Sequence, residues 1–464
     1  MTPERALTVV GHGPIAHTLV EALIRYGHRG PVTVFGARGT PAHEPALLPA
    51  VLDAGLTPEA LHLPPLPSAV QVHSGTEVLA IDRRRRLLHT SSGQTHAYQT
   101  LVLATGVQSK DPGIEAVPGP EATPPPGVRY LRTPADHRAV AAAEGPVVVA
   151  GGGLHGVGTA VALRAVGHEV TLVHPGPRPA HRELDARAGA VLAGALRQQG
   201  ITLELGHRVS AHQPGKAVLD DGRLLAAGLL LVCAGHRAHV DLARRAGLAL
   251  RGGAVRVDGR LRTCDPHVYA VGGCTADPAR DRAEDLAAVL TGRRALSRPA
   301  RRVLRPRVPG LDLTVLGEPV PEESGEHGEA EDVEVLTLTG PARHAHLRLR
   351  EGRLHGGVLI GLPKAAADLT RAYVEDRPLP SDRLALLLGR PSQYAGRGAL
   401  PLDAVLCQCN HVTKAALAGA WQSGARDLPA LAAATRVTTG CGSCSAVVAR
   451  LCAEWTEDRS EGKT

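Results

Sequence analysis

The sequence predicts an α/β protein with two Rossmann-like three-layer units, followed by a small α+β cap and a small helical domain. Two of the observations behind this prediction concern the Rossmann-like units. A short apolar strand runs directly into a glycine-rich turn and a helix, and the arrangement occurs twice, about 140 residues apart. The third observation is a group of four cysteines near the end of the sequence, which sets the last domain apart.

The first glycine-rich turn follows an apolar strand at residues 7–10 and contains Gly11, Gly13, Pro14 and Ala16. The two glycines allow a sharp turn and a close approach of the backbone to a pyrophosphate. The helix expected after them offers N–H groups and the positive end of its dipole to that anion. Ala16 stands where the motif has a third glycine, a change that the motif allows. A single copy of this pattern is also typical of an ordinary strand–turn–helix connection.

A second copy follows the strand at residues 146–150 and contains Gly151, Gly153 and Gly156. Two copies at strand–helix junctions predict that one chain binds two dinucleotides. The next strand ends at His174 rather than at an acidic residue. The carboxylate that is typical of NAD sites is therefore missing there, and nothing acidic repels the 2′-phosphate of NADPH. His174 is the candidate NAD(P)-binding residue at this strand end, and the choice between NADH and NADPH stays open.

Each unit ends in an apolar strand: one leads into Thr105 and Gly106, and its later echo covers residues 229–233. Residues 266–274 then contain Gly272 and Gly273. This order of motifs resembles the pyridine nucleotide-disulfide reductase superfamily. More narrowly, it is similar to the flavin and nicotinamide portion of assimilatory nitrite reductase large subunits and nitrate reductase electron-transfer subunits. The resemblance implies that NAD(P)H binds at the second turn. It implies that FAD binds at the first turn and at Thr105, Gly106, Gly272 and Gly273.

The same resemblance implies that the NAD(P)-binding domain is inserted in a split FAD-binding domain. We expect the FAD domain in residues 1–112 and 236–305, the NAD(P) domain in 113–235, the α+β cap in 306–395 and the last domain in 403–455. Within the cap, His344 and His346 share one face of a predicted strand. No carboxylate at a useful spacing accompanies them, so we interpret them as surface or interface residues rather than metal ligands.

Four cysteines form the last candidate site: Cys407 and Cys409 with one residue between them, and Cys441 and Cys444 with two. Two close thiolate pairs suit a soft metal centre, and the alternatives are an iron–sulfur cluster, zinc and free thiols. Structural zinc sites usually have two to four residues between paired cysteines, which disfavours zinc for the first pair. The surrounding stretch resembles the bacterioferritin-associated-ferredoxin type of domain, and this resemblance implies that all four cysteines ligate a [2Fe-2S] cluster.

Together these features predict an FAD-dependent NAD(P)H oxidoreductase that passes electrons from NAD(P)H to FAD, to the cluster and then to an acceptor redox protein. The resemblance implies that the acceptor is an assimilatory nitrate or nitrite reductase. The sequence identifies no catalytic residue, because this chemistry requires no nucleophile–base pair. Two other functions stay open: an electron-transfer subunit of an amino-acid or opine oxidase, and a redox-sensing or binding module without enzymatic activity.

Three departures from the family's pattern fall on the flavin side. Ala37 replaces the acidic residue expected at the end of the second strand, and Gly273 replaces another near the ribityl chain. The segment that begins at His43 lacks the arginine and lysine that the family has near the flavin. A charge-assisted hydrogen bond contributes roughly 1.5–3 kcal/mol, so the absence of two carboxylates predicts weaker FAD binding.

Composition narrows the class of partner. The formal net charge is +7, but basic residues are spread along the chain and aromatic residues make up only 2%, which argues against nucleic-acid binding. No apolar run reaches the ~18 residues that a membrane span needs, and no basic-then-apolar leader opens the sequence. Eight cysteines, four of them in one group, are more typical of a reducing cytoplasm than of a disulfide framework. We therefore expect a cytoplasmic protein that binds neither nucleic acid nor membranes, and its oligomeric state stays unknown.

Overall fold

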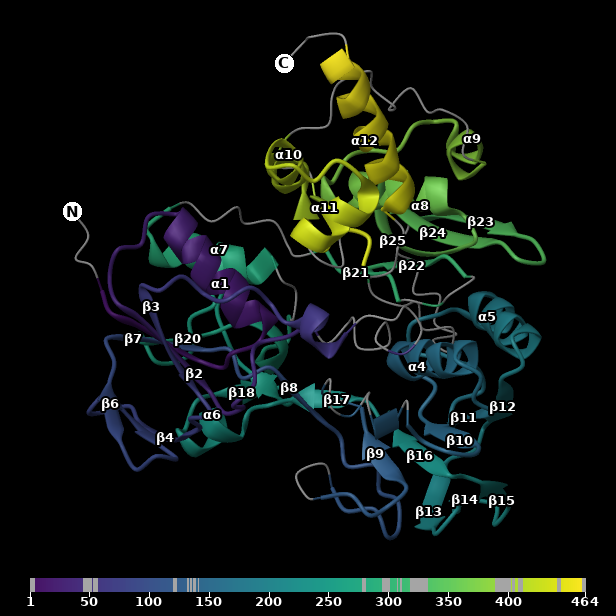
Figure 1. The fold of residues 1–464 in the computed structure, drawn as a ribbon, viewed down its shortest axis with the longest axis horizontal. Helices are drawn as coiled ribbons and strands as arrows, with labels where there is room; N and C mark the ends of the chain where they lie inside the picture. The colour runs from purple at the N-terminus through teal and green to yellow at the C-terminus, as the bar shows by residue number, and fades with distance from the viewer. Residues whose placement is uncertain are drawn as a thin grey trace.

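Figure 1 shows the computed structural model, in which two sheet-and-helix units lie beside a C-terminal sheet and a small helical domain. The structure describes residues 5–44, 52, 57–119, 123–131, 133, 136, 139–140, 142–277, 281–293, 301–306, 308, 311–317, 333–388, 402, 405–407, 412–439 and 444–460. The predicted domain boundaries at residues 1, 395 and 403 lie outside these described residues.

The first unit contains a five-stranded parallel sheet with the order β20-β7-β1-β2-β3. One face is covered by two helices, and three antiparallel strands pack on the other. The sheet strands are β1 (Leu7–Val10), β2 (Val32–Gly36), β3 (Val70–Ser74), β7 (Thr100–Leu103) and β20 (Val268–Ala270). The covering elements are α1 (Pro14–Arg25), α7 (Asp281–Leu290), β4 (Val78–Asp82), β5 (Leu87–Thr90) and β6 (Thr95–Ala97). All of β1 is buried because both faces of the sheet are covered.

The second unit repeats this plan with a parallel sheet in the order β12-β11-β10-β16-β9. Two helices contribute to the core on one face, and a three-stranded antiparallel sheet packs on the other. The sheet strands are β9 (Val128–Tyr130), β10 (Val147–Ala150), β11 (Val170–His174), β12 (Thr202–Leu205) and β16 (Leu229–Val232). The covering elements are α4 (Leu154–Ala165), α5 (Ala186–Gln198), β13 (Val209–Gln213), β14 (Lys216–Leu219) and β15 (Leu224–Ala226).

The second unit is inserted in the first. Strands β7 and β20 are neighbours in the first sheet, yet the chain builds the whole second sheet between them. Where the chain leaves and returns, β8 (Val107–Ser109) and β17 (His236–Ala238) pair as an antiparallel ladder. The arrangement confirms the predicted fold class of two Rossmann-like units, one of them split by the other.

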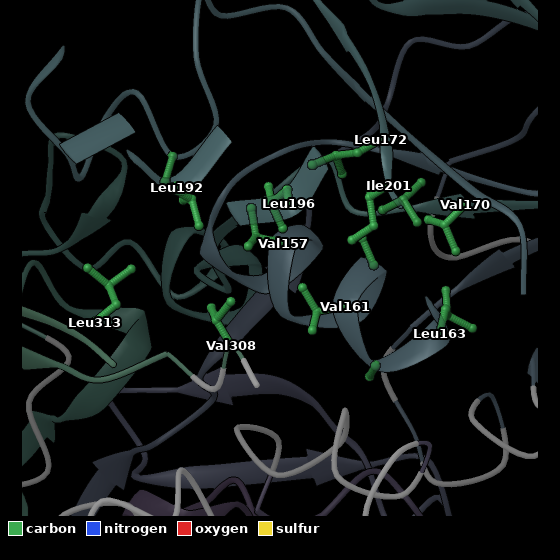
Figure 2. Packing of buried hydrophobic residues seen from close by; sticks show 14 of the residues in the cluster. Val157, Val161, Leu163, Val170, Leu172, Leu192, Leu196, Ile201, Val308 and Leu313 are labelled. Carbon is green, nitrogen blue, oxygen red and sulfur yellow. The ribbon is translucent and has the colours of Figure 1, made fainter. Parts of the chain in front are cut away.

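The C-terminal sheet is antiparallel, with the order β21-β22-β25-β24-β23. Its elements are β21 (Val303–Leu304), β22 (Leu313–Leu316), β23 (Val333–Thr339), β24 (His344–Arg350), β25 (Arg353–Ile360), α8 (Pro363–Val374) and α9 (Arg383–Leu387). Val308 and Leu313 belong to the same buried cluster as Val157 and Val161 of α4, and Figure 2 shows these side chains beside the helices of the second unit. Burial of aliphatic side chains therefore fastens the C-terminal sheet to the second unit.

The small last domain contains β26 (Val405–Cys407), β27 (Val412–Thr413), α10 (Lys414–Gln422), α11 (Leu428–Thr435) and α12 (Ser445–Ser460). Side chains cap two of its helices: Thr413 accepts from the Ala416 N–H at 3.2 Å, and Asp427 from the Ala430 N–H at 2.7 Å. The other short elements in the described ranges are η2 (Pro58–Leu61), α6 (Asp241–Arg245), β18 (Leu250–Arg251), β19 (Ala254–Val255) and η3 (Gly272–Cys274). None of the helices in the described ranges is both long and apolar enough to cross a bilayer.

Candidate functional site

The first glycine-rich turn joins β1 to α1. Gly11 has a φ of 120°, and a Cβ there would lie 2.1 Å from the carbonyl oxygen of Ala104, so only glycine fits. Gly13 is the N-cap of α1, and a Cβ on it would meet no described atom within 4 Å. Glycine at position 13 therefore leaves open space in front of the helix, which suits the approach of a ligand.

The second turn has the same geometry between β10 and α4. Gly151 has a φ of 123°, and its Cβ would lie 2.2 Å from the carbonyl oxygen of Cys233. Gly153 is the N-cap and, among the described residues, faces open space like Gly13. A Cβ on Gly156 would lie 1.8 Å from the carbonyl oxygen of Gly151, which forces glycine at this position and brings helix and turn together. Ala16 takes the corresponding place in the first unit and is 1% exposed.

No described side chain caps either helix at these turns. The N–H groups of the first helical turn and the positive end of the helix dipole are therefore directed at the open space beside Gly13 and Gly153. A pyrophosphate has the charge and the acceptor oxygens that such a helix terminus binds. The residues present fit a dinucleotide pyrophosphate at each of the two turns.

The structure brings the residues predicted for FAD to one edge of the first sheet. Gly11, Thr105 and Gly272 follow the carboxyl ends of the adjacent strands β1, β7 and β20. A Cβ on Gly272 would lie 2.9 Å from Ile15 in the first turn of α1, so this loop lies against the helix start that contains Pro14 and Ala16. The Thr105 hydroxyl donates to the carbonyl of His239 at 2.6 Å. Ligands of open parallel sheets bind at this carboxyl edge.

The structure shows the surroundings of Ala37 and Gly273, the two positions at which the sequence lacks the acidic residues expected near FAD. Ala37 is exposed directly after β2, where a carboxylate is missing. At Gly273 a Cβ would lie 2.7 Å from Val107 Cγ1 and 3.2 Å from the Gly106 carbonyl carbon. An acidic side chain at position 273 would need Val107 to move, so its absence belongs to the local packing. The first site thus fits the pyrophosphate of FAD well and its adenosine ribose less well.

An imidazole lies between the turn and the end of the second strand in both units. In the first unit His12 of the turn covers Gly36 at the end of β2, where a Cβ would lie 2.7 Å from the His12 Cβ. In the second unit the order is reversed: His174 at the end of β11 covers Gly152 of the turn, with a corresponding distance of 2.8 Å. Burial lowers the pKa of His12, and His17 lowers it further.

His174 uses both ring nitrogens inside the protein. Its Nδ1 accepts from the Gly152 N–H at 3.0 Å, and its Nε2 lies 2.8 Å from Nδ1 of His181. Burial lowers the pKa of His174 to about 4, with His181 and Arg182 adding to the effect. The ring is therefore neutral at pH 7, and because Nδ1 accepts, Nε2 carries the proton and donates to His181. The imidazole supports the turn while it occupies the strand end at which a ribose-binding residue is expected.

The sulfur site is described in part. Cys407 and Cys444 are 2% and 5% exposed and lie in one buried cluster with Trp421, Leu431 and Val448. Cys409 and Cys441, the other two predicted ligands, lie outside the described residues. Cys407 ends β26 and Cys444 lies in the turn before α12, and the fold brings both into one core. Thiolates gathered in a small apolar core suit a soft metal centre.

Two further histidines were not identified from sequence. His155 lies within the second turn pattern, 6.2 Å between ring centroids from His236 at the start of β17. Burial lowers the pKa of His155 to about 4, and His236 lowers it further. His155 is thus a neutral imidazole where the ladder between the two units begins. Its place between Gly153 and Gly156 was the only signal in the sequence.

A buried contact between a carboxylate and an imidazole joins the second unit to the C-terminal sheet. Asp185 caps α5 by accepting from the Ala188 N–H at 2.8 Å, and its Oδ2 lies 3.1 Å from Nε2 of His344 on β24. Nδ1 of His344 lies 3.2 Å from the Thr339 hydroxyl on β23. His344 is 1% exposed, so it is an interface residue and not a surface one, and the sequence analysis missed its carboxylate partner.

Two family models match the chain. The model of pyridine nucleotide-disulphide oxidoreductases matches residues 5–294, and the model of the BFD-like [2Fe-2S] binding domain matches residues 405–454. The Nitrite reductase [NAD(P)H] large subunit of Klebsiella oxytoca is 28% identical over 95% of this chain and 48% of its own length. The chlorobenzene dioxygenase ferredoxin reductase component of Cupriavidus sp. (strain PS12) is 30% identical over 82% of this chain and 95% of its own.

Solved structures agree with the fold. The covalent putidaredoxin reductase–putidaredoxin complex matches with a TM-score of 0.71 and 23% identity, covering 82% of this chain and 95% of that chain. The chain spans about half the length of the nitrite reductase large subunit from Klebsiella oxytoca. These findings confirm the resemblance stated from sequence. The first family implies FAD and NAD(P)H as cofactors of residues 5–294. The second implies that residues 405–454 hold a [2Fe-2S] cluster rather than zinc or free thiols.

Proposed function

This chain belongs to the pyridine nucleotide-disulphide oxidoreductase family, and on that premise we propose that it delivers electrons to an assimilatory nitrate or nitrite reductase. Its class is that of an NAD(P)H-dependent flavoprotein reductase with a [2Fe-2S] domain. When bound, FAD accepts a hydride from NAD(P)H and can release the two electrons singly to a one-electron centre. Gly11 and Gly13 hold the FAD pyrophosphate in this proposal, and Gly151, Gly153 and Gly156 hold that of NAD(P)H.

The observation that carries the proposal is the pair of matching turns at the carboxyl ends of two sheets in one chain. In the described residues, each turn places a helix N-terminus without a side-chain cap in front of open space, which supports binding of a dinucleotide at each turn by the same physical means. The cysteine-containing domain makes direct contact with the first unit through Arg436, whose guanidinium donates to the carbonyls of Leu61 and His62. Two nucleotides and a one-electron centre in one molecule are the parts that an electron-transfer reductase requires.

The identity of the acceptor is supported by the relatives. The nitrite reductase [NAD(P)H] large subunit of Klebsiella oxytoca and the nitrite reductase [NAD(P)H] of Bacillus subtilis (strain 168) match 95% and 96% of this chain. The ferredoxin reductase component matches 82% of the chain. We propose the nitrite reductase type as the nearer model because its likeness extends over nearly the whole chain. A cytoplasmic location is part of this proposal.

The test is a visible spectrum of protein purified without air, with iron, acid-labile sulfide and flavin counted per chain. NADH, NADPH or a mixture of amino acids is then added to separate samples. We expect bleaching of the flavin by a reduced nicotinamide nucleotide and not by amino acids. Bleaching by amino acids alone would identify an amino-acid or opine oxidase subunit instead. A preparation with iron and sulfide whose flavin site stays empty after reconstitution would identify a redox-sensing module.

The acceptor is tested separately. Purified nitrate or nitrite reductase from the same source is mixed with the chain and NAD(P)H, and consumption of nitrate or nitrite is followed. Ferredoxin is supplied in a parallel sample as the competing acceptor. Faster reduction of ferredoxin than of either reductase would contradict the proposed acceptor and leave the reductase class intact.

A further inference from the structure

Arg436 reaches from the cysteine-containing domain to the first unit. Its Nη1 donates to the carbonyl of His62 and its Nη2 to the carbonyl of Leu61, both at 3.2 Å. The partners are 374 and 375 residues away in the sequence. A guanidinium presents its donors in a rigid planar fork, so two bonds to consecutive carbonyls fix the angle as well as the distance between the two domains.

The carbonyls that accept these bonds belong to a firmly held segment. The Glu44 N–H donates to Leu61 O at 3.1 Å and the Leu63 N–H to Ala42 O at 2.7 Å, and His43 forms a β-bridge with His62. Leu61 is fully buried, and His43 and Glu44 are buried as well. Arg436 is thus bound to the segment that follows β2, in the unit whose carboxyl edge carries the FAD turn.

On its own side, Arg436 is held by the turn that leads to the cysteines. Its backbone has a φ of 63°, and its N–H donates to Ala432 O at 2.7 Å to end α11. Its carbonyl accepts from the Thr439 hydroxyl at 2.8 Å, and the next residue, Val437, is completely buried. The chain then continues to Cys441 and to Cys444 in the core. The position of the Arg436 backbone therefore determines where this cysteine segment starts.

The residue type at this position is informative. A left-handed residue at the end of a helix is usually glycine, because a side chain is disfavoured there. Arginine accepts that conformation here and uses its side chain for two bonds to another domain. The backbone alone does not explain an arginine at this helix end, whereas the contact with Leu61 and His62 does.

We propose that Arg436 is a positioning residue that fixes the [2Fe-2S] domain against the segment after β2 on the flavin unit. This inference rests on the proposed function and adds the contact that holds the cluster domain against the flavin unit. Transfer between two centres slows steeply as they separate. Loss of the contact should therefore slow the step into the cluster and leave the hydride step at the nicotinamide site unchanged.

The experiment compares Arg436→Gly, Arg436→Lys and the control Arg450→Ala in the full chain with its cofactors. Glycine suits the left-handed backbone, so the helix end keeps its conformation while the side chain is removed. Lysine keeps the charge without the planar fork and should have an intermediate effect. Arg450 lies on α12 of the same domain and pairs with Glu454 at 3.6 Å on the surface.

Two readouts are measured. Hydrogen–deuterium exchange reports the Glu44 and Leu63 amides, and we expect about tenfold faster exchange in Arg436→Gly. Rapid mixing with NAD(P)H reports flavin bleaching, expected to equal wild type, and cluster reduction, expected to be about tenfold slower. Iron per chain should stay constant, which shows that the domain is folded.

Equal exchange and equal cluster reduction in Arg436→Gly and Arg450→Ala would overturn the inference. A wild-type chain that NAD(P)H does not bleach would contradict the proposed function, yet the exchange measurement would still decide whether Arg436 holds the two domains together. The two failures are therefore distinguishable.

Discussion

Replacement of Asp185 tests whether its buried hydrogen bond with His344 stabilises the attachment of the C-terminal sheet. Asp185→Ala removes the cap of α5, which costs about 1 kcal/mol in typical helices. It also leaves the buried Nε2 of His344 without its carboxylate partner at 3.1 Å, which costs about 1–3 kcal/mol. The side chains are 9% and 2% exposed, so solvent compensates little. We expect the free energy of unfolding to fall by about 2–4 kcal/mol.

Asp185→Asn should cost less, about 1 kcal/mol, because asparagine caps helices as well as aspartate does. Its amide NH₂ can donate to Nε2 if the imidazole adopts its other tautomer. Asp427→Ala is the matched control: Asp427 caps α11 at 2.7 Å from the Ala430 N–H but is exposed, so only the cap is lost. Urea titrations of the full chain, followed by circular dichroism, compare the first unfolding transition of each variant.

The difference in unfolding free energy between wild type and Asp185→Asn should depend on pH in a direction that the pKa of Asp185 determines. Burial raises the pKa of Asp185, but hydrogen bonds from His344 and the Ala188 N–H outweigh burial and lower the pKa below its ordinary 3.8. A lowered carboxyl pKa contributes stability that is present above the unfolded pKa and is lost as pH falls through the folded one. The gap between wild type and Asp185→Asn should therefore be full at neutral pH and close below pH 3.8. An Asp185→Ala loss no larger than that of Asp427→Ala, or equal losses for Ala and Asn at position 185, would refute the reasoning.

Four further substitutions test the cofactor sites. Gly13→Val should leave folding unchanged, because no described atom lies within 4 Å of the new Cβ, but should reduce bound FAD per chain about tenfold. Equal FAD contents in the Gly13→Val variant and wild type would contradict the ligand-facing position of Gly13. Gly11→Ala should instead lower the free energy of unfolding by roughly 1–3 kcal/mol, because its Cβ would lie 2.1 Å from Ala104 O. Cys407→Ser should reduce iron and acid-labile sulfide to background while FAD per chain stays constant, and retained iron would exclude Cys407 as a ligand. His174→Asp places a carboxylate at the end of β11 and should raise the ratio of kcat/KM for NADH to kcat/KM for NADPH about tenfold. An unchanged ratio would show that this strand end does not contact the ribose.

Local spacing in the sequence was sufficient to predict two dinucleotide-binding units and a candidate soft metal centre, whereas FAD, NAD(P)H and the [2Fe-2S] cluster followed from the resemblance to known families. Gly11 and Gly151 have positive φ values at strand–helix junctions, a local backbone conformation that a short motif can report. The cysteine pairs are informative for the same reason, because close spacing brings ligands together whatever the rest of the chain does. The repeat of the glycine turn indicated two nucleotides, and the inserted sheet followed from the family's order of motifs.

Contacts between distant elements could not be predicted in this way. His344 was recognised as one of two histidines on a strand face, but its carboxylate lies 159 residues earlier, at the start of a helix in another unit. The contact of Arg436 with His62 depends on how two domains distant in sequence pack against each other. Nothing in the local pattern of either residue names its partner. The physiological acceptor is a second protein, and no residue pattern in this sequence identifies it.

The two nucleotide units also differ in a way that bears on how such a chain can diverge. Between turn and strand end one imidazole lies against a glycine, His12 against Gly36 in one unit and His174 against Gly152 in the other. A mutation that adds a second ring would collide with the first, and one that removes the ring would leave a hole. Histidine and glycine at these paired sites are thus expected to change together among descendants of this chain, each substitution permitting the other.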